Sequence, residues 1–151
     1  MKERTIGPYH LAVDVEANRA YCEAHPLPWV TCDCSGCRNF VLAVKTLPPA
    51  VTEFFTKLGL DVEKPAETMY YIGTPKDISG GGWYHLKGEI LEGGPWQKGL
   101  PPEAWVEITP TFSVAFHREC MLMPDDFPRP CIQMEVDYRL PWLLEEENNY
   151  I

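Results

Sequence analysis

Cysteines are concentrated in one short segment of the chain, which reads C-D-C-S-G-C from Cys32 to Cys37. Thiolates are good zinc ligands, and zinc in proteins takes four ligands in a tetrahedron. Gly36 permits the sharp turn that lets Cys34 and Cys37 point at one ion. Cys32 lies two residues before Cys34, on the same side of an extended segment. The spacing predicts a zinc site with Cys32, Cys34 and Cys37 as ligands.

The fourth zinc ligand has to come from elsewhere, because the sequence contains no second C-x2-C and no H-x3-H pattern. We expect His10 to supply it, since alternation places this histidine on the polar face of a strand. Cys22 and His25 are the alternatives, because they lie nearest to the cysteines in the sequence. The remaining cysteines, Cys120 and Cys131, are expected to be ordinary buried thiols.

Thiol redox chemistry is the alternative use of the same residues. A C-x2-C pair can provide a nucleophilic cysteine of low pKa and a second cysteine that resolves the mixed disulfide. Such a pair normally opens a helix. The residues that follow Cys37 favour strands, so zinc is the preferred interpretation. The alternative function is therefore a thiol oxidoreductase, or a zinc-dependent enzyme that uses Cys32, Cys34 and Cys37.

The elements that position these residues are predicted to be mostly short antiparallel strands. Proline accounts for 15 of 151 residues, which favours many short elements joined by turns. Alternation of apolar and polar residues indicates strands with one wet face, at 9–15, 69–72, 83–91, 105–108, 112–116 and 132–138. The predicted fold class is mainly β, an antiparallel β-sandwich or open barrel.

One amphipathic helix is predicted, at about 49–59. Its apolar residues recur at the spacing that lines one helical face: Val51, Phe54, Phe55 and Leu58. Pro49 suits the first turn of a helix, and Gly59 suits the left-handed position that ends one. A helix of this length is not stable alone, so the apolar face is expected to pack on a sheet.

The remaining segments show neither the alternation of a half-buried strand nor the spacing of an amphipathic helix. A cysteine-containing loop is predicted at about 16–39, and the apolar run 40–44 is expected to be a buried strand. The glycines at 80–82 are expected to form a flexible hairpin turn. The acidic end of the chain, 145–149, is expected to be a frayed tail. Residues 1–151 are expected to form a single domain.

The composition bears on location and partners. The net charge is −9, so the chain lacks the basic surface that nucleic-acid binding requires. The N-terminal residues contain no apolar run that would serve as a signal peptide or membrane span, so we expect a cytoplasmic protein. Cysteines in that compartment are reduced or bound to metal. The sequence predicts a non-enzymatic binding protein with a structural zinc knuckle, and a protein as its partner rather than a nucleic acid or a membrane.

Overall fold

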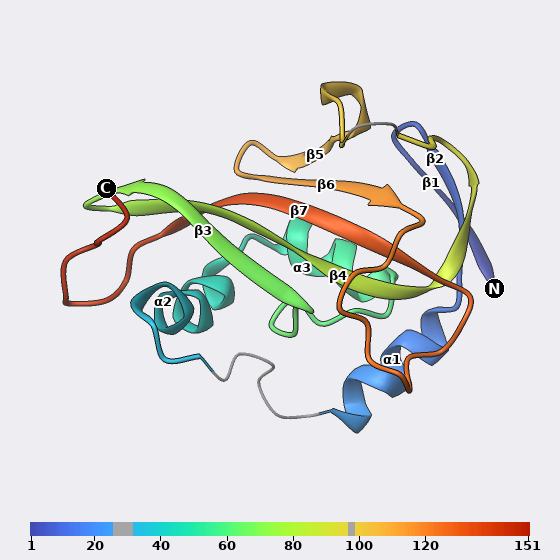
Figure 1. Cartoon of the computed structure of the whole chain (residues 1–151), viewed down its shortest axis with the longest axis horizontal. Helices are drawn as coiled ribbons and strands as arrows, with labels where there is room; N and C mark the ends of the chain where they lie inside the picture. Colours follow the sequence, from blue (N-terminus) through green and yellow to red (C-terminus); the bar gives the residue numbers. More distant parts are fainter. Residues whose placement is uncertain (26–31, 97–98) are drawn as a thin grey trace.

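The computed structural model describes residues 1–25, 32–96 and 99–151, and the strands in these ranges form one open antiparallel sheet (Figure 1). The strands are β1 Lys2–Ile6, β2 Tyr9–Val13, β3 Glu67–Thr74, β4 Asp77–Glu92, β5 Val106–Thr109, β6 Phe112–His117 and β7 Cys131–Pro141. Six of them follow the order β1-β2-β4-β7-β6-β5, and β3 pairs with the first half of β4. Strand residues outnumber helical residues, so the prediction of a mainly β, antiparallel fold is confirmed.

The long strands β4 and β7 form the centre of the sheet. They pair from Asp77 opposite Pro141 to Lys87 opposite Cys131. The apolar residues of the predicted alternation in β7 are all buried: Ile132, Met134, Val136 and Tyr138. Their burial is expected to provide a large part of the free energy that holds the sheet against its helices.

The described ranges contain three α-helices, α1 Val15–Ala24, α2 Ser35–Ala43 and α3 Pro49–Lys57, and the short 3-10 helices Val44–Thr46 and Pro102–Ala104. The rings of Phe55 in α3 and Tyr84 in β4 pack with centroids 4.8 Å apart, and Phe40 in α2 packs 6.0 Å from Tyr138. Tyr84 and Tyr138 lie on the same face of the sheet, so α2 and α3 cover that face together. No helix in these ranges is long and apolar enough to cross a membrane.

Helix α3 is the helix predicted at 49–59. Val51, Phe55 and Leu58 are buried, and Phe54 is partly buried against the same core. Gly59 follows the helix with a φ of +78°, and a Cβ at this position would lie 2.2 Å from the carbonyl oxygen of Val15. Glycine is therefore required here both by the left-handed backbone and by the close approach of α1.

Two other helices lie where a loop and a strand were predicted. All of α1 except its first residue, and most of α2, lie within the predicted loop 16–39. The rest of α2 covers most of the predicted strand 40–44, so both predictions are wrong where the chain is described. Residues 26–31 of that loop lie outside the described residues. Side chains start both helices: the Asp14 carboxylate accepts the Ala17 amide at 3.0 Å, and Cys34 caps α2.

The C-terminal segment is packed rather than frayed, which corrects the prediction for 145–149. Asn148 is 5% exposed, and its Nδ2 donates to the carbonyl oxygens of Thr74 and Asp77 at 2.9 and 3.0 Å. The indole of Trp142 donates to the Glu146 carbonyl at 2.8 Å. These three hydrogen bonds tie the segment to the β3–β4 hairpin and to itself.

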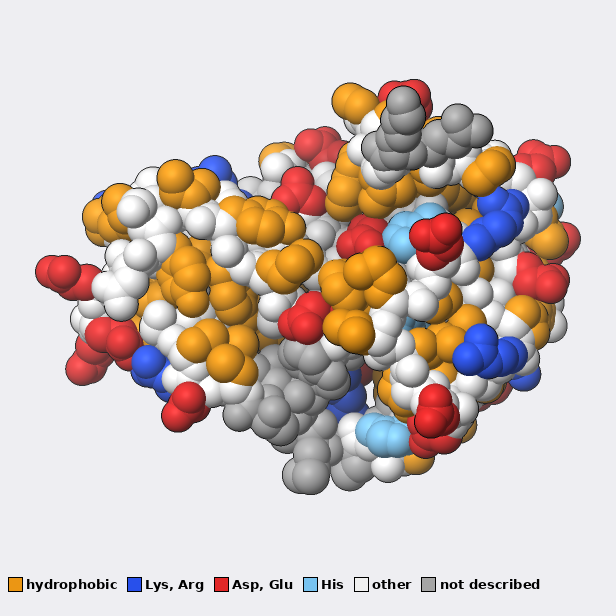
Figure 2. Space-filling model, viewed as in Figure 1, with side chains coloured by type: hydrophobic (Ala, Val, Ile, Leu, Met, Phe, Trp, Pro, Cys, Tyr) orange, Lys and Arg blue, Asp and Glu red, His pale blue; other side chains and the backbone are white. Residues whose placement is uncertain are grey.

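Apolar side chains also reach the surface on this side of the molecule. Tyr71 and Ile72 of β3 are 56% and 62% exposed. Figure 2 shows apolar side chains gathered over the region of β3, with acidic groups scattered over the rest of the face and along its rim. The acidic side chains on this face are spread out and do not form a single patch.

Candidate metal centre

The three predicted zinc ligands meet at the start of α2. The Sγ atoms of Cys32, Cys34 and Cys37 all lie within 4.8 Å of one another, and we call these residues the α2 cluster. A zinc–sulfur bond of about 2.3 Å in a tetrahedron places the sulfurs ~3.8 Å apart. Cys32 and Cys34 are exposed and Cys37 is buried, so the cluster opens to solvent on one side. One ion fits the cluster with small movements of exposed side chains.

Backbone amides hold the sulfurs of this cluster. Cys34 is the N-cap of α2, and its Sγ accepts the Cys37 amide at 3.4 Å. The Cys34 amide in turn points at the Cys32 Sγ, 3.5 Å away. The N-terminus of a helix carries a partial positive charge, which stabilises a thiolate placed there. The geometry therefore favours negative charge on the Cys34 sulfur.

Two tyrosines approach the cluster across Gly36. The Tyr70 hydroxyl of β3 donates to the Cys37 Sγ at 3.3 Å. A Cβ on Gly36 would lie 2.4 Å from the ring of Tyr70 and 2.9 Å from the hydroxyl of Tyr150. The glycine is thus required by the close approach of the Tyr70 ring and the Tyr150 hydroxyl, and not by a left-handed turn, because Gly36 lies within α2. The cluster is assembled from α2, β3 and the C-terminal segment.

The environment separates the acidities of the cysteines. Burial disfavours the Cys34 thiolate, but the Cys37 amide, the thiols of Cys32 and Cys37 and the Tyr150 hydroxyl donate to it, and the net effect lowers the pKa of Cys34. Burial, together with the neighbouring Cys34 and Cys32, raises the pKa of Cys37 to about 12 despite the hydrogen bond from Tyr70. Without a cation, Cys34 ionises well before Cys37.

His10 does not belong to this cluster. It lies on β2, which Figure 1 places at the opposite end of the molecule from α2. Its Nε2 is 3.8 Å from the Glu3 carboxylate on β1. The alternation that placed His10 on the less buried face of its strand was right, but the strand is remote from the cysteines.

The alternative fourth ligands also lie outside the cluster. Cys22 belongs to α1, and His25 directly follows that helix, with its Nδ1 2.8 Å from the Tyr21 carbonyl oxygen. Residues 26–31 contain no cysteine, histidine or acidic residue. In the described ranges, no fourth Cys, His, Asp or Glu joins the three cysteines. The arrangement offers one ion three protein ligands and an open fourth position.

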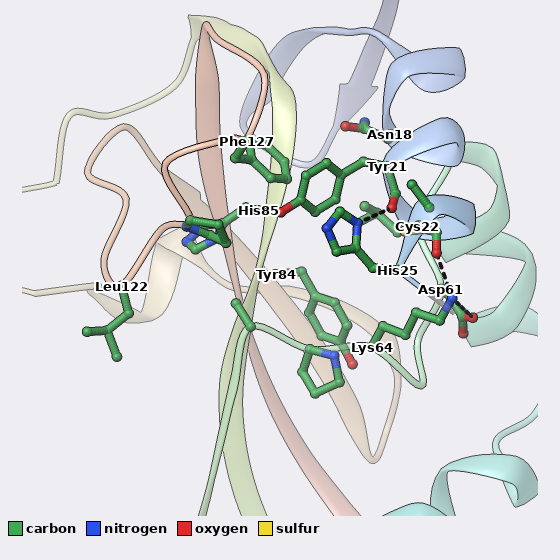
Figure 3. Close-up of a pocket in the computed structure, with 15 residues that line it drawn as sticks. Asn18, Tyr21, Cys22, His25, Asp61, Lys64, Tyr84, His85, Leu122 and Phe127 are labelled. Atoms are coloured by element: carbon green, nitrogen blue, oxygen red, sulfur yellow. Dashed lines mark hydrogen bonds and ion pairs between the residues drawn. The ribbon is translucent and has the colours of Figure 1, made fainter. Parts of the chain in front are cut away.

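Sequence reasoning missed a pocket that Cys22 and His25 do line (Figure 3). Its volume is about 480 Å³, and its walls come from α1, from residues 60–66, from β4 and from the loop before β7. His25 stacks on Tyr21 with ring centroids 4.2 Å apart. The lining is mainly aromatic and apolar, and suits an apolar molecule better than an ion. Because the lining residues are scattered along the chain, no local motif could have revealed it.

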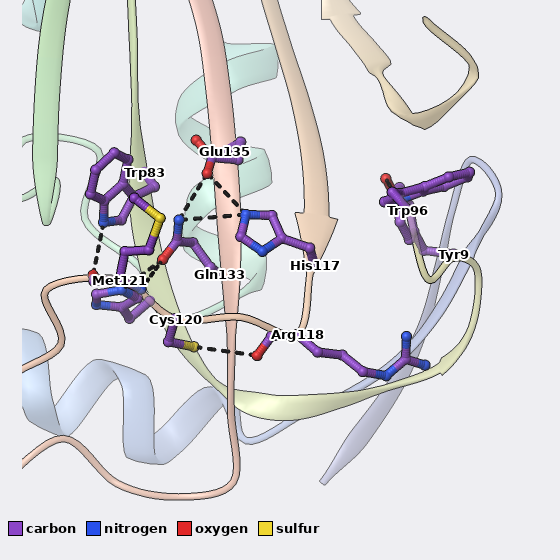
Figure 4. Close-up of polar contacts among 10 residues, drawn as sticks. Tyr9, Trp83, Trp96, His117, Arg118, Cys120, Met121, Gln133 and Glu135 are labelled. Carbon is purple, nitrogen blue, oxygen red and sulfur yellow. Dashed lines mark hydrogen bonds and ion pairs between the residues drawn. The ribbon is translucent and has the colours of Figure 1, made fainter. Parts of the chain in front are cut away.

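A polar network covers the other face of the sheet (Figure 4). Gln133 is fully buried, and its Oε1 accepts the Met121 amide at 2.7 Å and lies 3.1 Å from the Nε2 of His85. Its amide nitrogen donates to Glu135 at 2.8 Å, and Glu135 pairs with His117 at 2.9 Å. Burial lowers the pKa of His85, which keeps it neutral at pH 7. The network fixes the loop 118–130 on the sheet.

Comparison with known proteins does not identify this arrangement. No family model matches the chain, and neither a curated protein nor a solved structure is significantly similar to it. What the chain shows by itself is an antiparallel sheet that supports a three-cysteine cluster able to hold a metal ion.

Proposed function

We propose that the protein is a non-enzymatic, cytoplasmic binding protein that holds one zinc ion in the α2 cluster. The convergence of the three sulfurs, all within 4.8 Å at the start of a helix, is the observation that supports this proposal. An all-thiolate set without carboxylates suits zinc better than magnesium or calcium. Iron–sulfur clusters are a poorer match, because they generally require four cysteines.

The role of zinc in this proposal is structural, and it requires a fourth ligand from a protein partner, because a structural zinc site is closed by four protein ligands. Three thiolates this close repel one another until a cation neutralises them. The ion would fix Cys32 and Cys34, which are exposed, to Cys37, which is buried against β3. It would thereby pin the connection between α1 and α2 to the sheet. Water takes the fourth position in the free protein, and a donor atom from a protein partner can replace it.

The test is the zinc content of the full chain, purified under reducing conditions from zinc-containing medium. We expect one zinc per chain in the wild type and loss of zinc in Cys34→Ser. Cys22→Ser is the matched control, because this half-buried thiol lies outside the cluster, and it should keep its zinc. A wild-type protein that neither carries zinc nor takes it up would overturn the proposal, as would full zinc content in Cys34→Ser.

A second candidate is dithiol redox chemistry at Cys34 and Cys37, and the helix α2 that begins at this pair favours it. The exposed Cys34 thiolate would attack a substrate disulfide, forming a mixed disulfide and releasing one substrate thiolate. Cys37 would then lose its proton and attack Cys34, which releases the second substrate thiolate and leaves a Cys34–Cys37 disulfide. The two electrons gained by the substrate come from the two cysteines.

Disulfide reduction by the zinc-free protein distinguishes the two candidates. The redox function predicts that the zinc-free, reduced chain reduces a small aromatic disulfide, that Cys34→Ser abolishes the reaction and that Cys32→Ser retains it. Mass spectrometry should then recover a disulfide between Cys34 and Cys37. Equal, slow reaction of the wild type and Cys34→Ser would eliminate this candidate.

A further inference from the structure

Three sulfur atoms meet at the base of the loop 118–130, away from the α2 cluster. The Sγ atoms of Cys120 and Cys131 are 3.4 Å apart, and the Sγ of Cys131 is 3.1 Å from the Sδ of Met123. We call Cys120, Met123 and Cys131 the loop cluster. All three side chains line one open pocket of about 400 Å³. The sequence had predicted only ordinary buried thiols here, but both cysteines are partly exposed.

We propose that the loop cluster is a binding site for monovalent copper, Cu(I). Its donors are two thiols and a thioether, soft ligands that suit Cu(I) better than oxygen-seeking cations, and the thioether is not among the usual zinc ligands. Binding releases the two thiol protons and leaves a Cu(I) dithiolate with one net negative charge. The thioether of Met123 supplies a third, neutral donor without adding charge.

The charges around the pocket complement that product. Arg118 and Arg129 line the same pocket as the three sulfurs. A guanidinium near the complex offsets its single negative charge. Arg129 is the residue placed to do so, because the Arg118 guanidinium is engaged elsewhere and donates from Nη2 to the Ile90 carbonyl oxygen at 3.0 Å. Figure 4 shows the Arg118 guanidinium pointing away from Cys120, whose thiol contacts Arg118 only at the carbonyl oxygen, 3.9 Å away.

The donors are also positioned before any ion binds. Cys131 is the first residue of β7 and pairs with Lys87 of the central strand β4. Cys120 and Met123 flank Met121, whose amide donates to the buried Gln133 at 2.7 Å. The polar network beneath the loop thus fixes the backbone that carries two of the sulfurs, and the sheet fixes the third.

The experiment is an anaerobic titration of the reduced full chain with Cu(I), in competition with a chromogenic Cu(I) chelator. The Cys32→Ser/Cys34→Ser chain serves as the background, because it lacks two donors of the α2 cluster, and both substituted residues are exposed. We expect this chain to bind one Cu(I). Adding Cys131→Ser should abolish binding, and adding Met123→Leu should weaken it at least about tenfold.

Met121→Leu is the matched control, because Met121 is 49% exposed and contributes its backbone, not its sulfur, to the network. It should leave the Cu(I) affinity unchanged. Leucine has nearly the volume of methionine, so both leucine variants should fold. Equal affinities of the Met123→Leu and Met121→Leu chains would overturn the proposal, as would a background chain that binds no Cu(I). Neither result would affect the zinc site, which the background chain lacks.

Discussion

The α2 cluster and the loop cluster are both groups of sulfur atoms, but the surroundings of the two groups differ. In the α2 cluster, a helix N-terminus and a tyrosine direct N–H and O–H groups at the sulfurs. In the loop cluster, the sulfurs contact mainly one another. Accordingly the pKa of Cys34 is lowered, whereas burial and the neighbouring Cys131 raise the pKa of Cys120 to about 12.

This difference shows how surroundings select the chemistry of a thiol. Directed donors stabilise thiolates, and three thiolates suit a divalent ion such as zinc. Without such donors, and with a thioether in the set, the sulfurs suit a monovalent soft ion that needs less negative charge around it. The two clusters should therefore differ in thiol reactivity. Metal binding by a cluster should not depend on small changes in the stability of the fold.

The largest expected effect on stability lies far from sulfur. Phe55→Ala removes a fully buried ring that packs on Tyr84 and Phe112. We expect it to lower the free energy of unfolding by about 3–5 kcal/mol, measured by urea denaturation. Phe54→Ala should cost clearly less, because Phe54 is only partly buried. Zinc content should be unchanged in both, and loss of zinc in Phe55→Ala would mean that metal binding reports only on folding.

Zinc removal is expected to have the next largest effect. At free zinc a thousand times its dissociation constant, binding adds about 4 kcal/mol to the stability of the folded chain. For a protein of this size, a chelator should lower the melting temperature by about 10 °C. The Cys34→Ser chain should melt at the same temperature with and without chelator. An equal chelator shift in Cys34→Ser would place the stabilising ion outside the α2 cluster.

Gly36→Ala tests the close packing around the α2 cluster. The new methyl group would overlap the Tyr70 ring at 2.4 Å, so the ring or the helix must move. We expect a loss of about 1–3 kcal/mol in the free energy of unfolding, together with weaker zinc binding. Asp33→Ala, at an exposed position between two of the cysteines, is the control and should change neither. Unchanged stability in Gly36→Ala would refute the packing described here.

The smallest expected effect is on thiol reactivity, which compares the clusters directly. In the zinc-free protein, the lowered pKa of Cys34 gives it more thiolate at pH 7.5 than an ordinary cysteine has. Cys120, with a pKa of about 12, stays protonated until strongly alkaline pH. Iodoacetamide followed by peptide mass spectrometry should therefore modify Cys34 at least about tenfold faster than Cys120. Faster modification of Cys120 than of Cys34 would contradict the proposed difference between the two clusters.

The sequence predicted well those elements whose periodicity was unambiguous. The alternation of β7 and the four apolar positions of α3 were sufficient, because one face of each element packs on the core. Helix α2 was missed because Phe40 to Val44 is a continuous apolar run, and such a run does not distinguish the periodicity of a helix from that of a strand. Its start was also hidden, since cysteine is not among the usual N-cap residues.

Contacts between distant segments explain the other errors. The glycines 80–82, expected to form a turn, lie inside β4, where Gly80 leaves room for the ring of Tyr138. The three cysteines of the α2 cluster could be predicted because they are adjacent in sequence. His10 could not be excluded without the sheet order, and Met123 could not be linked to Cys131 without the loop geometry. Spacing along the sequence can predict only those sites whose residues lie close together in the sequence.

The ligands of the proposed zinc site are counted most directly by zinc-edge X-ray absorption of the zinc-loaded chain. We expect three sulfurs at about 2.3 Å and one oxygen at about 2.0 Å, from a bound water. Cys34→Ser should lose this signature. Four sulfur ligands, or a histidine nitrogen in the fourth position, would contradict the open site proposed for Cys32, Cys34 and Cys37.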